Sequence, residues 1–413
     1  MKILLIDPGG QGFSTRKDMP FWYPRLGIPM VAAHTPDDVE VCILDNEFEE
    51  IDYDLPFDLV GITVLTQYAP TAYEISARFK AHGIPTLLGG IHVTALPDEG
   101  LRFADAVLIG EAEAIWQDVI DDVRSGHLKG IYRSSRYPKM EKLRAPRLDL
   151  LTQKDRYTTL NLLQTSRGCP YGCEFCSVSK FYSRRFRHRP IELIIREVEN
   201  RLQQDNPVVF IDAELTGSRN FSKRLFAALK PLGIRWIGPG NLNIADDPEL
   251  LSLAAASGCQ MLYMGFETVC EANLRFIGKY RRTSMPGWED SIKRIFDAGI
   301  LLSSTFIFGF DNDDETVFER TVEFVIRNNL VPSMFHILTP YPGTTLYDRL
   351  EKEGRIIERD WAKYDMTSVV IRPRKMSPEA LEGGVAWAYQ QIPNIKTCMD
   401  EIVTGSVNGV PTG

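Results

Sequence analysis

Short apolar runs that alternate with helical segments are the feature that most constrains the fold of this chain. The runs are nearly continuous in apolar residues, which is typical of strands buried on both faces of a parallel sheet. Such strand–helix alternation predicts an α/β fold with ligands at the carboxyl ends of the strands. In the first part of the chain we expect strands over Lys2–Asp7, Val39–Asp45, Asp58–Leu65, Thr86–Gly90 and Ala106–Gly110.

The alternation restarts near Thr159, and six further runs, each followed by a helical segment, predict an incomplete (β/α)6 barrel. These runs are Leu160–Thr165, Val208–Asp212, Arg235–Pro239, Met261–Glu267, Leu301–Phe310 and Met334–Thr339. We therefore expect four parts along the chain. They are a Rossmann-like, doubly wound domain over residues 1–132, a linker over 133–158, the barrel over 159–372 and a helical C-terminal extension over 373–413.

Composition narrows the class of protein. The chain has 413 residues, enough for two or three domains, and a net charge of −8, so it has no general attraction for nucleic acid or anionic membranes. No segment approaches the roughly 18 apolar residues that span a bilayer, and the first residues lack the features of a signal peptide. We expect a cytoplasmic protein without a membrane span or a nucleic-acid partner. The basic, proline-containing residues 133–158 are interpreted as an exposed linker, because they lack interleaved aromatic residues.

Three of the seven cysteines, Cys169, Cys173 and Cys176, lie within eight residues directly after the first expected barrel strand. The odd total argues against a disulfide framework, and thiolates at this density suit an iron–sulfur cluster or zinc. Three ligands are one fewer than usual, which leaves one corner of the metal site open to a substrate. His188 is the local candidate for a fourth ligand, so a structural zinc site stays an alternative, as do three buried thiols.

The sequence C-x3-C-x-F-C at this position resembles the radical S-adenosylmethionine (SAM) superfamily. There the three cysteines hold a [4Fe-4S] cluster and SAM binds the fourth iron, so the resemblance implies Cys169, Cys173 and Cys176 as metal ligands. The aromatic residue before the third cysteine, a G-x-E pattern, the T-F-I-F-G segment and an L-T-P-Y-P-G-T turn follow in the family's order. By resemblance, the expected SAM contacts are Phe175, Glu267, Thr305, Gly309, Leu338 and Tyr341.

Asp212 and Glu214 occupy the place where many members carry a glycine-rich or paired acidic motif for the SAM amino group. Here Ala213 stands where the second aspartate of such a pair would be, so either carboxylate is a candidate contact. The alternative is that both only cap the following helix.

The first 130 residues resemble the cobalamin-binding domain of one radical SAM subfamily. Glycines at a strand end let a large ligand approach the backbone, and nearby hydroxyls offer contacts to its tail. The resemblance implies cobalamin contacts from Thr63, Thr66, Gly89, Gly90, Gly110 and Glu111. The D-x-H-x-x-G motif that supplies a lower histidine ligand is absent, so the lower face of the cobalt would be open, water-bound or shielded. His92 is interpreted as a structural histidine rather than a cofactor contact.

Two further segments leave alternatives open. The loop Pro8–Arg25 contains Phe13, Phe21, Trp22 and Tyr23, which would cover a planar cofactor or anchor the loop on the barrel. The basic run Lys180–Arg189 ends in R-x-R-P, which favours a structural or cofactor role over recognition of an anionic substrate.

The resemblance implies a reaction in which the reduced cluster cleaves SAM and the resulting radical abstracts hydrogen from an unactivated C–H bond. Cobalamin-dependent C-methylation of a small-molecule, lipid or natural-product substrate is the favoured outcome. The segments Glu358–Asp365 and Ile371–Glu379 resemble hopanoid-type methylases and the anaerobic porphyrin-ring cyclase, so oxidative cyclisation or rearrangement is the second hypothesis. A cobalamin sensor with an inactive barrel is the third.

The expected partners are a small-molecule substrate and an external reductant such as flavodoxin or ferredoxin. Methylthiotransferases need three further N-terminal cysteines, whereas this chain has only Cys42 there, and Cys398 alone does not provide for an auxiliary cluster. No acid–base residue is predicted.

Overall fold

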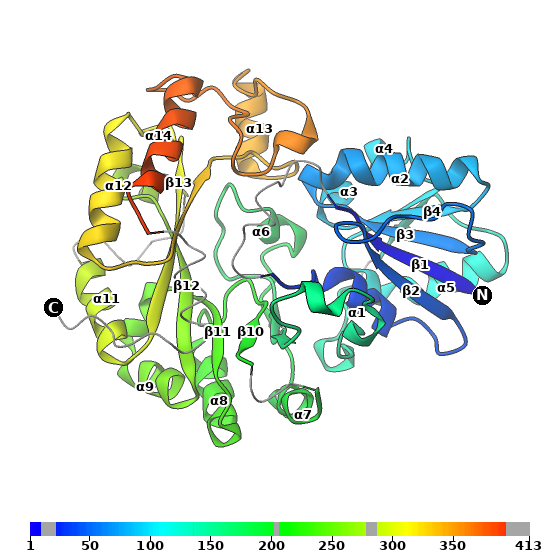
Figure 1. Ribbon diagram of the computed structural model, residues 1–413, viewed down its shortest axis with the longest axis horizontal. Helices are drawn as coiled ribbons and strands as arrows, with labels where there is room; N and C mark the ends of the chain where they lie inside the picture. Colours follow the sequence, from blue (N-terminus) through cyan, green and yellow to red (C-terminus); the bar gives the residue numbers. More distant parts are fainter. Residues whose placement is uncertain (10–21, 135, 202–205, 278–286, 394–413) are drawn as a thin grey trace.

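The computed structural model describes residues 1–9, 22–134, 136–201, 206–277 and 287–393. Figure 1 shows two lobes, an N-terminal one in blue and cyan and a larger one in green to orange, with helix α6 (Ser177–Phe181) between them. The predictions made for Phe13 and Phe21, for Cys398 and for a frayed C-terminus lie outside the described residues.

The N-terminal lobe is built on a parallel sheet of six strands in the order β2-β1-β3-β4-β5-β6. The strands are β1 (Lys2–Asp7), β2 (Glu40–Asp45), β3 (Leu59–Thr63), β4 (Thr86–Gly89), β5 (Ala106–Ile109) and β6 (Ile131–Arg133). The helices are α1 (Gly27–Ala33), α2 (Ala69–Ala81), α3 (Ile91–Ala95), α4 (Pro97–Gly100) and α5 (Trp116–Arg124). The predicted doubly wound domain is confirmed, and β6 is an edge strand that the sequence did not predict.

The larger lobe contains a second parallel sheet of six strands, in the order β14-β13-β12-β11-β10-β7. Its strands are β7 (Leu162–Leu163), β10 (Val208–Phe210), β11 (Trp236–Gly240), β12 (Cys259–Glu267), β13 (Leu301–Phe308) and β14 (Ser333–Ile337). Because β7 and β14 are the two ends of this order, the sheet is the incomplete barrel that the six βα units predicted. A short antiparallel ribbon, β8 (Ser166–Arg167) with β9 (Arg187–His188), was not predicted.

Helices follow the barrel strands, as expected. They are α7 (Ile191–Arg201), α8 (Arg219–Leu229), α9 (Pro248–Ala256), α10 (Glu271–Ile277), α11 (Trp288–Asp297), α12 (Thr316–Arg327), α13 (Thr345–Lys352) and α14 (Pro378–Gln390). Several begin at a side-chain cap, which satisfies an otherwise unpaired backbone N–H. Thr344 Oγ1 accepts from the N–H of Tyr347 at 3.1 Å and so starts α13, and Ser377 Oγ accepts from the N–H of Ala380 at 3.1 Å at the start of α14.

Helix α14 packs against the edge strand β14. The hydroxyl of Tyr389 accepts a hydrogen bond from the N–H of Phe335 and donates one to the carbonyl of the same residue, both at 2.9 Å. A single side chain of the C-terminal extension therefore satisfies both outward-facing backbone groups of this strand residue.

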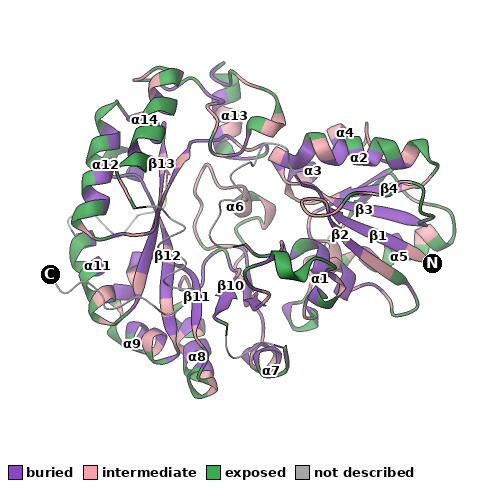
Figure 2. Ribbon diagram, in the orientation of Figure 1, coloured by how far each residue is buried: buried purple, intermediate pink, exposed green. Residues whose placement is uncertain are grey.

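The hydrophobic core runs without interruption from one lobe into the other. Figure 2 shows most strands of the two sheets as largely buried, with the edge strands β2 and β6 more exposed. One cluster of buried side chains joins β1 and β5 to Leu162 and Val209 of the barrel. Residues 133–158 contribute to this cluster through Met140, Leu143, Leu148, Leu151 and Tyr157, all less than 9% exposed. The expectation that this segment is an exposed linker is therefore wrong for its apolar side chains, which fill the junction between the sheets.

None of the helices in the described part of the chain is long and apolar enough to cross a membrane.

Candidate active site and cofactor pockets

The three clustered cysteines lie on one loop between β8 and α6, where the two lobes meet. Cys169, Cys173 and Cys176 are each partly exposed, and the N–H of Cys176 donates to the carbonyl of Cys173 at 3.2 Å, which closes a turn. Partial exposure on one tight loop lets thiolates reach a bound metal group. We call residues 169–176 the cysteine loop.

Gly168 fixes the direction in which the cysteine loop leaves β8. Its φ is +84°, and a Cβ at this position would lie 1.9 Å from the carbonyl oxygen of Arg185. Only glycine fits such a position, because an added methyl group would occupy the same space as a backbone atom. The opposite side of the loop is less crowded, since a Cβ at Gly172 would meet only the guanidinium end of Arg184, at 3.1 Å.

A buried group of ion pairs joins the start of the cysteine loop to the N-terminal lobe. The guanidinium of Arg167 binds Glu111 at 2.7 Å and also binds Glu113, and Arg187 on β9 binds the second oxygen of Glu111. The side chains of Arg167, Glu111 and Glu113 are each at most 6% exposed. Burial alone would favour the neutral acid, but the nearby Arg167 outweighs it and lowers the pKa of Glu113.

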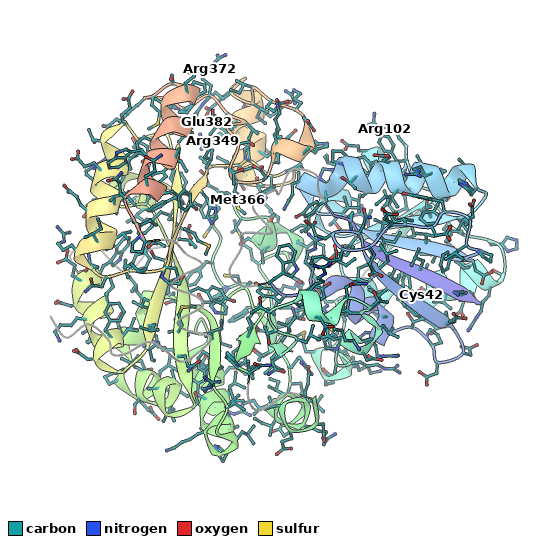
Figure 3. All side chains as sticks on the ribbon, in the orientation of Figure 1. Cys42, Arg102, Arg349, Met366, Arg372 and Glu382 are labelled. Carbon is teal, nitrogen blue, oxygen red and sulfur yellow. The ribbon has the colours of Figure 1, made fainter. Side chains whose placement is uncertain are left out.

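The middle of the cysteine loop is held from the other side by α13. Arg349, labelled in Figure 3, binds Glu174 at 3.2 Å and Asp311 at 2.8 Å. The N–H of Leu346 also donates to the carbonyl of Glu174 at 3.0 Å. Burial raises the pKa of Glu174, and Arg349 opposes that shift. The loop is therefore fixed by charged contacts to elements on both of its sides.

Asp212 and Glu214, the two carboxylates considered for the SAM amino group, have different surroundings. Asp212 accepts hydrogen bonds from the N–H of Thr165 at 3.2 Å, from its hydroxyl at 2.9 Å and from the hydroxyl of Ser166. Burial raises the pKa of Asp212 to about 6, although these donors oppose the shift. Glu214 accepts from the N–H and the hydroxyl of Thr216 at 2.8 and 2.7 Å. Both carboxylates thus organise the strand ends beside the cysteine loop.

Glu267 ends β12 in an unusual backbone conformation. Its φ is +67°, the register with β13 shifts between Gly265 and Glu267, and the residue is only 7% exposed. A residue with a side chain is disfavoured in the left-handed region, and such strain gathers at functional sites. The backbone conformation of Glu267 therefore makes it a candidate functional residue independently of the sequence motif.

The remaining candidates for SAM contact lie within β13, just after β13 and β14, and on the cysteine loop. Thr305 is partly exposed on β13, and Gly309 follows that strand with a φ of +103°. The ring of Phe175 meets the edge of Phe310, with centroids 6.2 Å apart. After β14, Leu338 donates its N–H to the carbonyl of Phe308 at 2.9 Å, and the carbonyl of Tyr341 accepts from the N–H of Thr344 at 3.2 Å. The P-G-T turn that follows reaches the N-terminal lobe, since a Cβ at Gly343 would lie 3.1 Å from that of Ala95.

Sequence reasoning missed Asp313 and His336, which lie close to these positions. Asp313 is fully buried and accepts from the N–H groups of Gly309 and Phe310, both at 3.0 Å, and burial raises its pKa to about 7. His336 lies on β14 between the buried Phe335 and Ile337. Burial lowers the pKa of His336, and the nearby charge of Glu267 opposes that shift. An isolated aspartate and histidine carry no sequence signal of this kind.

A cavity of about 190 Å³ opens at the carboxyl ends of β3, β4 and β5. Five of the six residues expected to contact cobalamin line it, namely Thr63, Gly89, Gly90, Gly110 and Glu111. The same cavity is lined by Glu113, Gln164, Arg167, Phe181 and Tyr182, which were not predicted. Gly90 has a φ of +108°, and a Cβ there would lie 2.9 Å from the backbone of Val64. The cavity therefore lies between the N-terminal sheet and the residues that flank the cysteine loop.

Thr66 and His92 lie together and are not among the residues that line this cavity. Thr66 Oγ1 is 3.3 Å from His92 Nδ1, and both residues are buried. On its other side, His92 Nε2 is 3.5 Å from Glu99 Oε1, which also accepts from Trp361 Nε1 at 2.8 Å. These contacts support the interpretation of His92 as a structural histidine, at the junction between the N-terminal lobe and the larger lobe.

Several side chains of the basic run after the cysteine loop bind or pack against other residues of this chain. The guanidinium groups of Arg185 and Arg187 both lie 4.8 Å from the centre of the Tyr137 ring, and Arg189 binds Glu197 at 2.6 Å. The ring of His188 packs on Phe186 and Phe221, with centroids 4.4 and 4.1 Å away. These contacts support a structural role for the run and give His188 apolar neighbours. Within the described residues, no three His, Cys, Asp or Glu side chains surround a position for a single metal ion.

Comparison with known proteins finds two families along the chain. The family described as the radical SAM superfamily matches residues 163–325, and the B12 binding domain matches residues 19–120. The chain is 31% identical to bacteriochlorophyllide d C-12(1)-methyltransferase of Chlorobaculum tepidum, over 92% of this chain and 84% of that protein.

Two other relatives are more distant. The chain is 27% identical to the hopanoid C-2 methylase of Rhodopseudomonas palustris, over 83% of this chain and 67% of that protein. It is 26% identical to the anaerobic magnesium-protoporphyrin IX monomethyl ester cyclase of Rubrivivax gelatinosus, over 95% and 77% of the two chains. Among solved structures, the radical SAM methyltransferase TsrM of Kitasatospora setae, with cobalamin and a [4Fe-4S] cluster bound, has the same fold. The TM-score is 0.71 at 16% identity, covering 95% of this chain and 89% of TsrM.

Proposed function

The chain belongs to the radical SAM superfamily, among the members that carry a B12-binding domain, and we propose that it methylates a carbon atom of a tetrapyrrole. The resemblance expected from the cysteine motif and from the N-terminal glycines is confirmed by the comparisons. The protein is an enzyme that uses a [4Fe-4S] cluster, SAM and cobalamin, and C-methylation is the reaction that its relatives favour. This assignment replaces the alternatives of a structural zinc site and of a sensor.

One observation carries the proposal: residues that flank the cysteine loop also line the cavity of the B12-binding domain. Arg167 lies two residues before Cys169, lines the cavity and binds two glutamates of the other lobe. A radical formed at SAM and a methyl group carried by cobalamin must both reach one substrate atom, so their two sites have to adjoin. The position of the cavity beside the residues that flank the cysteine loop supports this arrangement.

The residues present fit these cofactors. Three partly exposed thiolates on a loop shaped by Gly168 suit an iron–sulfur cluster with one iron left for SAM. A Cβ at Gly110 would meet nothing within 4 Å, so this residue leaves open space at the end of β5 where a large ligand can approach the backbone. When bound, the cofactors supply a carbon-centred radical that removes hydrogen from a C–H bond and a methyl group that replaces it. The chain orients them and excludes water.

We further propose that SAM contacts Phe175, Glu267, Thr305, Gly309, Leu338 and Tyr341, with Asp212 or Glu214 near its amino group. Cobalamin would contact Thr63, Gly89, Gly90, Gly110 and Glu111. Thr66 is a weaker candidate, because it lies beside His92 and is not among the residues that line the cavity.

Glu267→Gln is expected to weaken SAM binding about tenfold to a hundredfold while leaving the cluster in place. The change keeps the size of the side chain and removes its charge, and hydrogen bonds to a charged group contribute roughly 1.5–3 kcal/mol each. At about 1.4 kcal/mol per decade this range gives the expected factor. Reductive cleavage of SAM at limiting SAM concentration, together with iron content and melting temperature, measures the effect.

Glu271→Gln is the matched control for Glu267→Gln. Glu271 lies on the adjacent helix α10, and its ion pair with Arg275 is exposed. We expect it to change neither SAM affinity nor stability measurably, because exposed pairs contribute little. If Glu267→Gln lowered the melting temperature but left SAM affinity unchanged, Glu267 would serve only to hold the strand.

The substrate class rests on the relatives and on the inside of the barrel. Two of the three relatives named above are called after tetrapyrroles, and one of them is the 31% identical protein. The partly exposed residues on β12, β13 and β14 include Tyr263, Thr305, Ile307, Met334 and His336. This mixture of apolar and polar groups suits a large, mostly apolar ring with polar substituents.

The test is a reaction with SAM that carries a deuterated methyl group. Anaerobic enzyme with cluster, cobalamin and a chemical reductant is incubated with a bacteriochlorophyllide, and the product is examined by mass spectrometry. The expected product has gained one fully deuterated methyl group in exchange for hydrogen. A product that has lost hydrogen without gaining the label would assign oxidative cyclisation, and labelling of a hopanoid but not of the tetrapyrrole would replace the substrate class.

A radical SAM enzyme requires a reductant and a substrate. We propose flavodoxin or ferredoxin as the electron donor and the cytoplasm as the location, because neither the acidic charge nor the described helices provide a membrane contact.

A further inference from the structure

We infer that the ion pairs of Arg167 couple the two cofactor sites, so that cobalamin binds more tightly when the iron–sulfur cluster is present, and the reverse. The inference rests on the cofactor sites proposed above. It assigns a positioning role to Arg167 and Glu113, and adds this role to the cobalamin contact proposed for Glu111.

The first step is the geometry of the link. Arg167 is two residues before Cys169 in the chain, and its two terminal nitrogens bind two different carboxylates, Glu111 and Glu113. Both carboxylates follow Gly110, which has a φ of +89° and donates its N–H to Thr94 Oγ1 at 3.0 Å. The chain entering the cysteine loop is thus tied to the segment 110–113 through a rigid, two-pronged guanidinium contact.

The second step is the position of the same segment in the cavity. Gly110, Glu111, Ala112 and Glu113 all line the cavity of the B12-binding domain, and so does Arg167. A ligand that fills this cavity therefore fixes the segment that holds Arg167. Because the carboxylates are then already ordered, less conformational entropy is lost when the cysteine loop closes on a cluster, which is a source of positive cooperativity.

The third step is burial. Arg167 and the two glutamates are almost completely removed from solvent, so their interaction is little screened, and a displaced carboxylate would leave a charge unpaired. A contact of this kind favours one arrangement of the loop over intermediate ones. A surface ion pair would transmit no comparable constraint.

Arg187 extends the link to the other end of the cysteine loop. It lies on β9, pairs with Arg167 across the ribbon and binds the second oxygen of Glu111. Glu111 therefore receives one arginine from the strand before the loop and one from the strand after it. Both ends of the segment that carries the three cysteines depend on one carboxylate of the cobalamin domain.

The experiment measures the cobalamin dissociation constant of cluster-loaded and cluster-free protein by spectral titration of hydroxocobalamin under anaerobic conditions. For the wild type we expect the loaded form to bind about tenfold more tightly, within the usual range of such couplings. Glu113→Gln removes one carboxylate and keeps its size, and the ratio of the two constants should fall toward one. The double variant Arg167→Gln/Glu113→Gln removes one charge of each sign and is expected to do the same if the single variant is unstable.

Glu197→Gln is the matched control. It breaks another buried ion pair, between Arg189 and Glu197, whose partners both belong to the barrel lobe. This variant should keep the wild-type ratio even if it lowers the melting temperature. A ratio near one in the wild type, or an unchanged ratio in both Glu113 variants, would overturn the coupling while leaving the proposed function intact. Failure of any form to bind cobalamin would overturn the proposed function as well.

Discussion

Replacing any one of Cys169, Cys173 and Cys176 with alanine is expected to abolish the [4Fe-4S] cluster and, with it, reductive cleavage of SAM. We propose each cysteine as one of three protein ligands of the cluster, so the loss of one would leave too few to hold it. Anaerobic reconstitution followed by iron and sulfide analysis and by visible absorbance measures the effect. The expected change is from about one cluster per chain to none.

Two controls belong to this experiment. Cys270→Ala changes a partly exposed cysteine that lies after β12, outside the loop, and should retain the full iron content. His188→Ala tests the zinc alternative, and we expect the variant to keep its cluster because the imidazole packs between two phenylalanine rings. Loss of metal in His188→Ala, with zinc in place of iron in the wild type, would contradict the assignment.

Gly168→Ala is expected to remove the cluster almost as completely as loss of a cysteine, although no ligand is changed. The positive φ costs a residue with a side chain about 1–2 kcal/mol. The new methyl group would also lie 1.9 Å from the carbonyl oxygen of Arg185. A backbone atom cannot rotate away, so the entrance of the cysteine loop must move, and we expect the loop to lose the conformation that binds the cluster. Iron content and the melting temperature of the reconstituted protein measure the result.

Gly172→Ala provides the comparison for Gly168→Ala within the same loop. Its Cβ would meet the end of the Arg184 side chain, which is flexible and can shift. We expect the cluster to form in this variant at close to the wild-type level. Equal loss of iron in both variants would show that the loop tolerates no added volume anywhere, and that the contact with Arg185 is not the reason.

The strands could be predicted from the sequence because a strand buried on both faces leaves a continuous apolar run. Runs such as Lys2–Asp7 and Met261–Glu267 therefore coincide with β1 and the end of β12. The edge strand β6 escaped prediction because two of its three residues, Ile131 and Arg133, are exposed. The burial of apolar side chains in residues 140–157 was not predicted either. Single apolar residues between basic ones show no strand or helix period, so the sequence contains no sign that they are buried.

The candidate site could be predicted only as far as local motifs reach. The spacing of the cysteines and the glycines at strand ends are local signals, and the structure brings these residues to the place where the lobes meet. The partners of Arg167 are 54 and 56 residues away in the chain, and no local pattern links them. The sequence shows Arg167 before the first cysteine and Glu111 and Glu113 after a strand. Their pairing depends on how the two lobes pack, which the sequence does not show.

The backbone conformation of Glu267 is another feature that could not be predicted from the sequence. The G-x-E motif pointed to this residue, yet a left-handed conformation at the end of a strand is set by the register shift against β13 and not by residue type. Similarly, the sequence offered Thr66 and Thr63 as equivalent hydroxyls. The structure separates them, because Thr63 ends β3 at the cavity whereas Thr66 begins a helical turn beside His92.

The hydrogen bonds of Tyr389 bear on how copies of this chain avoid joining one another. A strand at the end of a sheet presents N–H and C=O groups that can pair with a strand from another molecule, which is a route to aggregation. At Phe335 both of those groups of β14 are already bonded to one phenolic hydroxyl, at 2.9 Å each. At Phe335, the Tyr389 hydroxyl thus makes the two hydrogen bonds that a neighbouring strand would otherwise make. Tyr389→Phe would leave the N–H and C=O of Phe335 without this partner, and would open that point of the β14 edge to pairing with another strand.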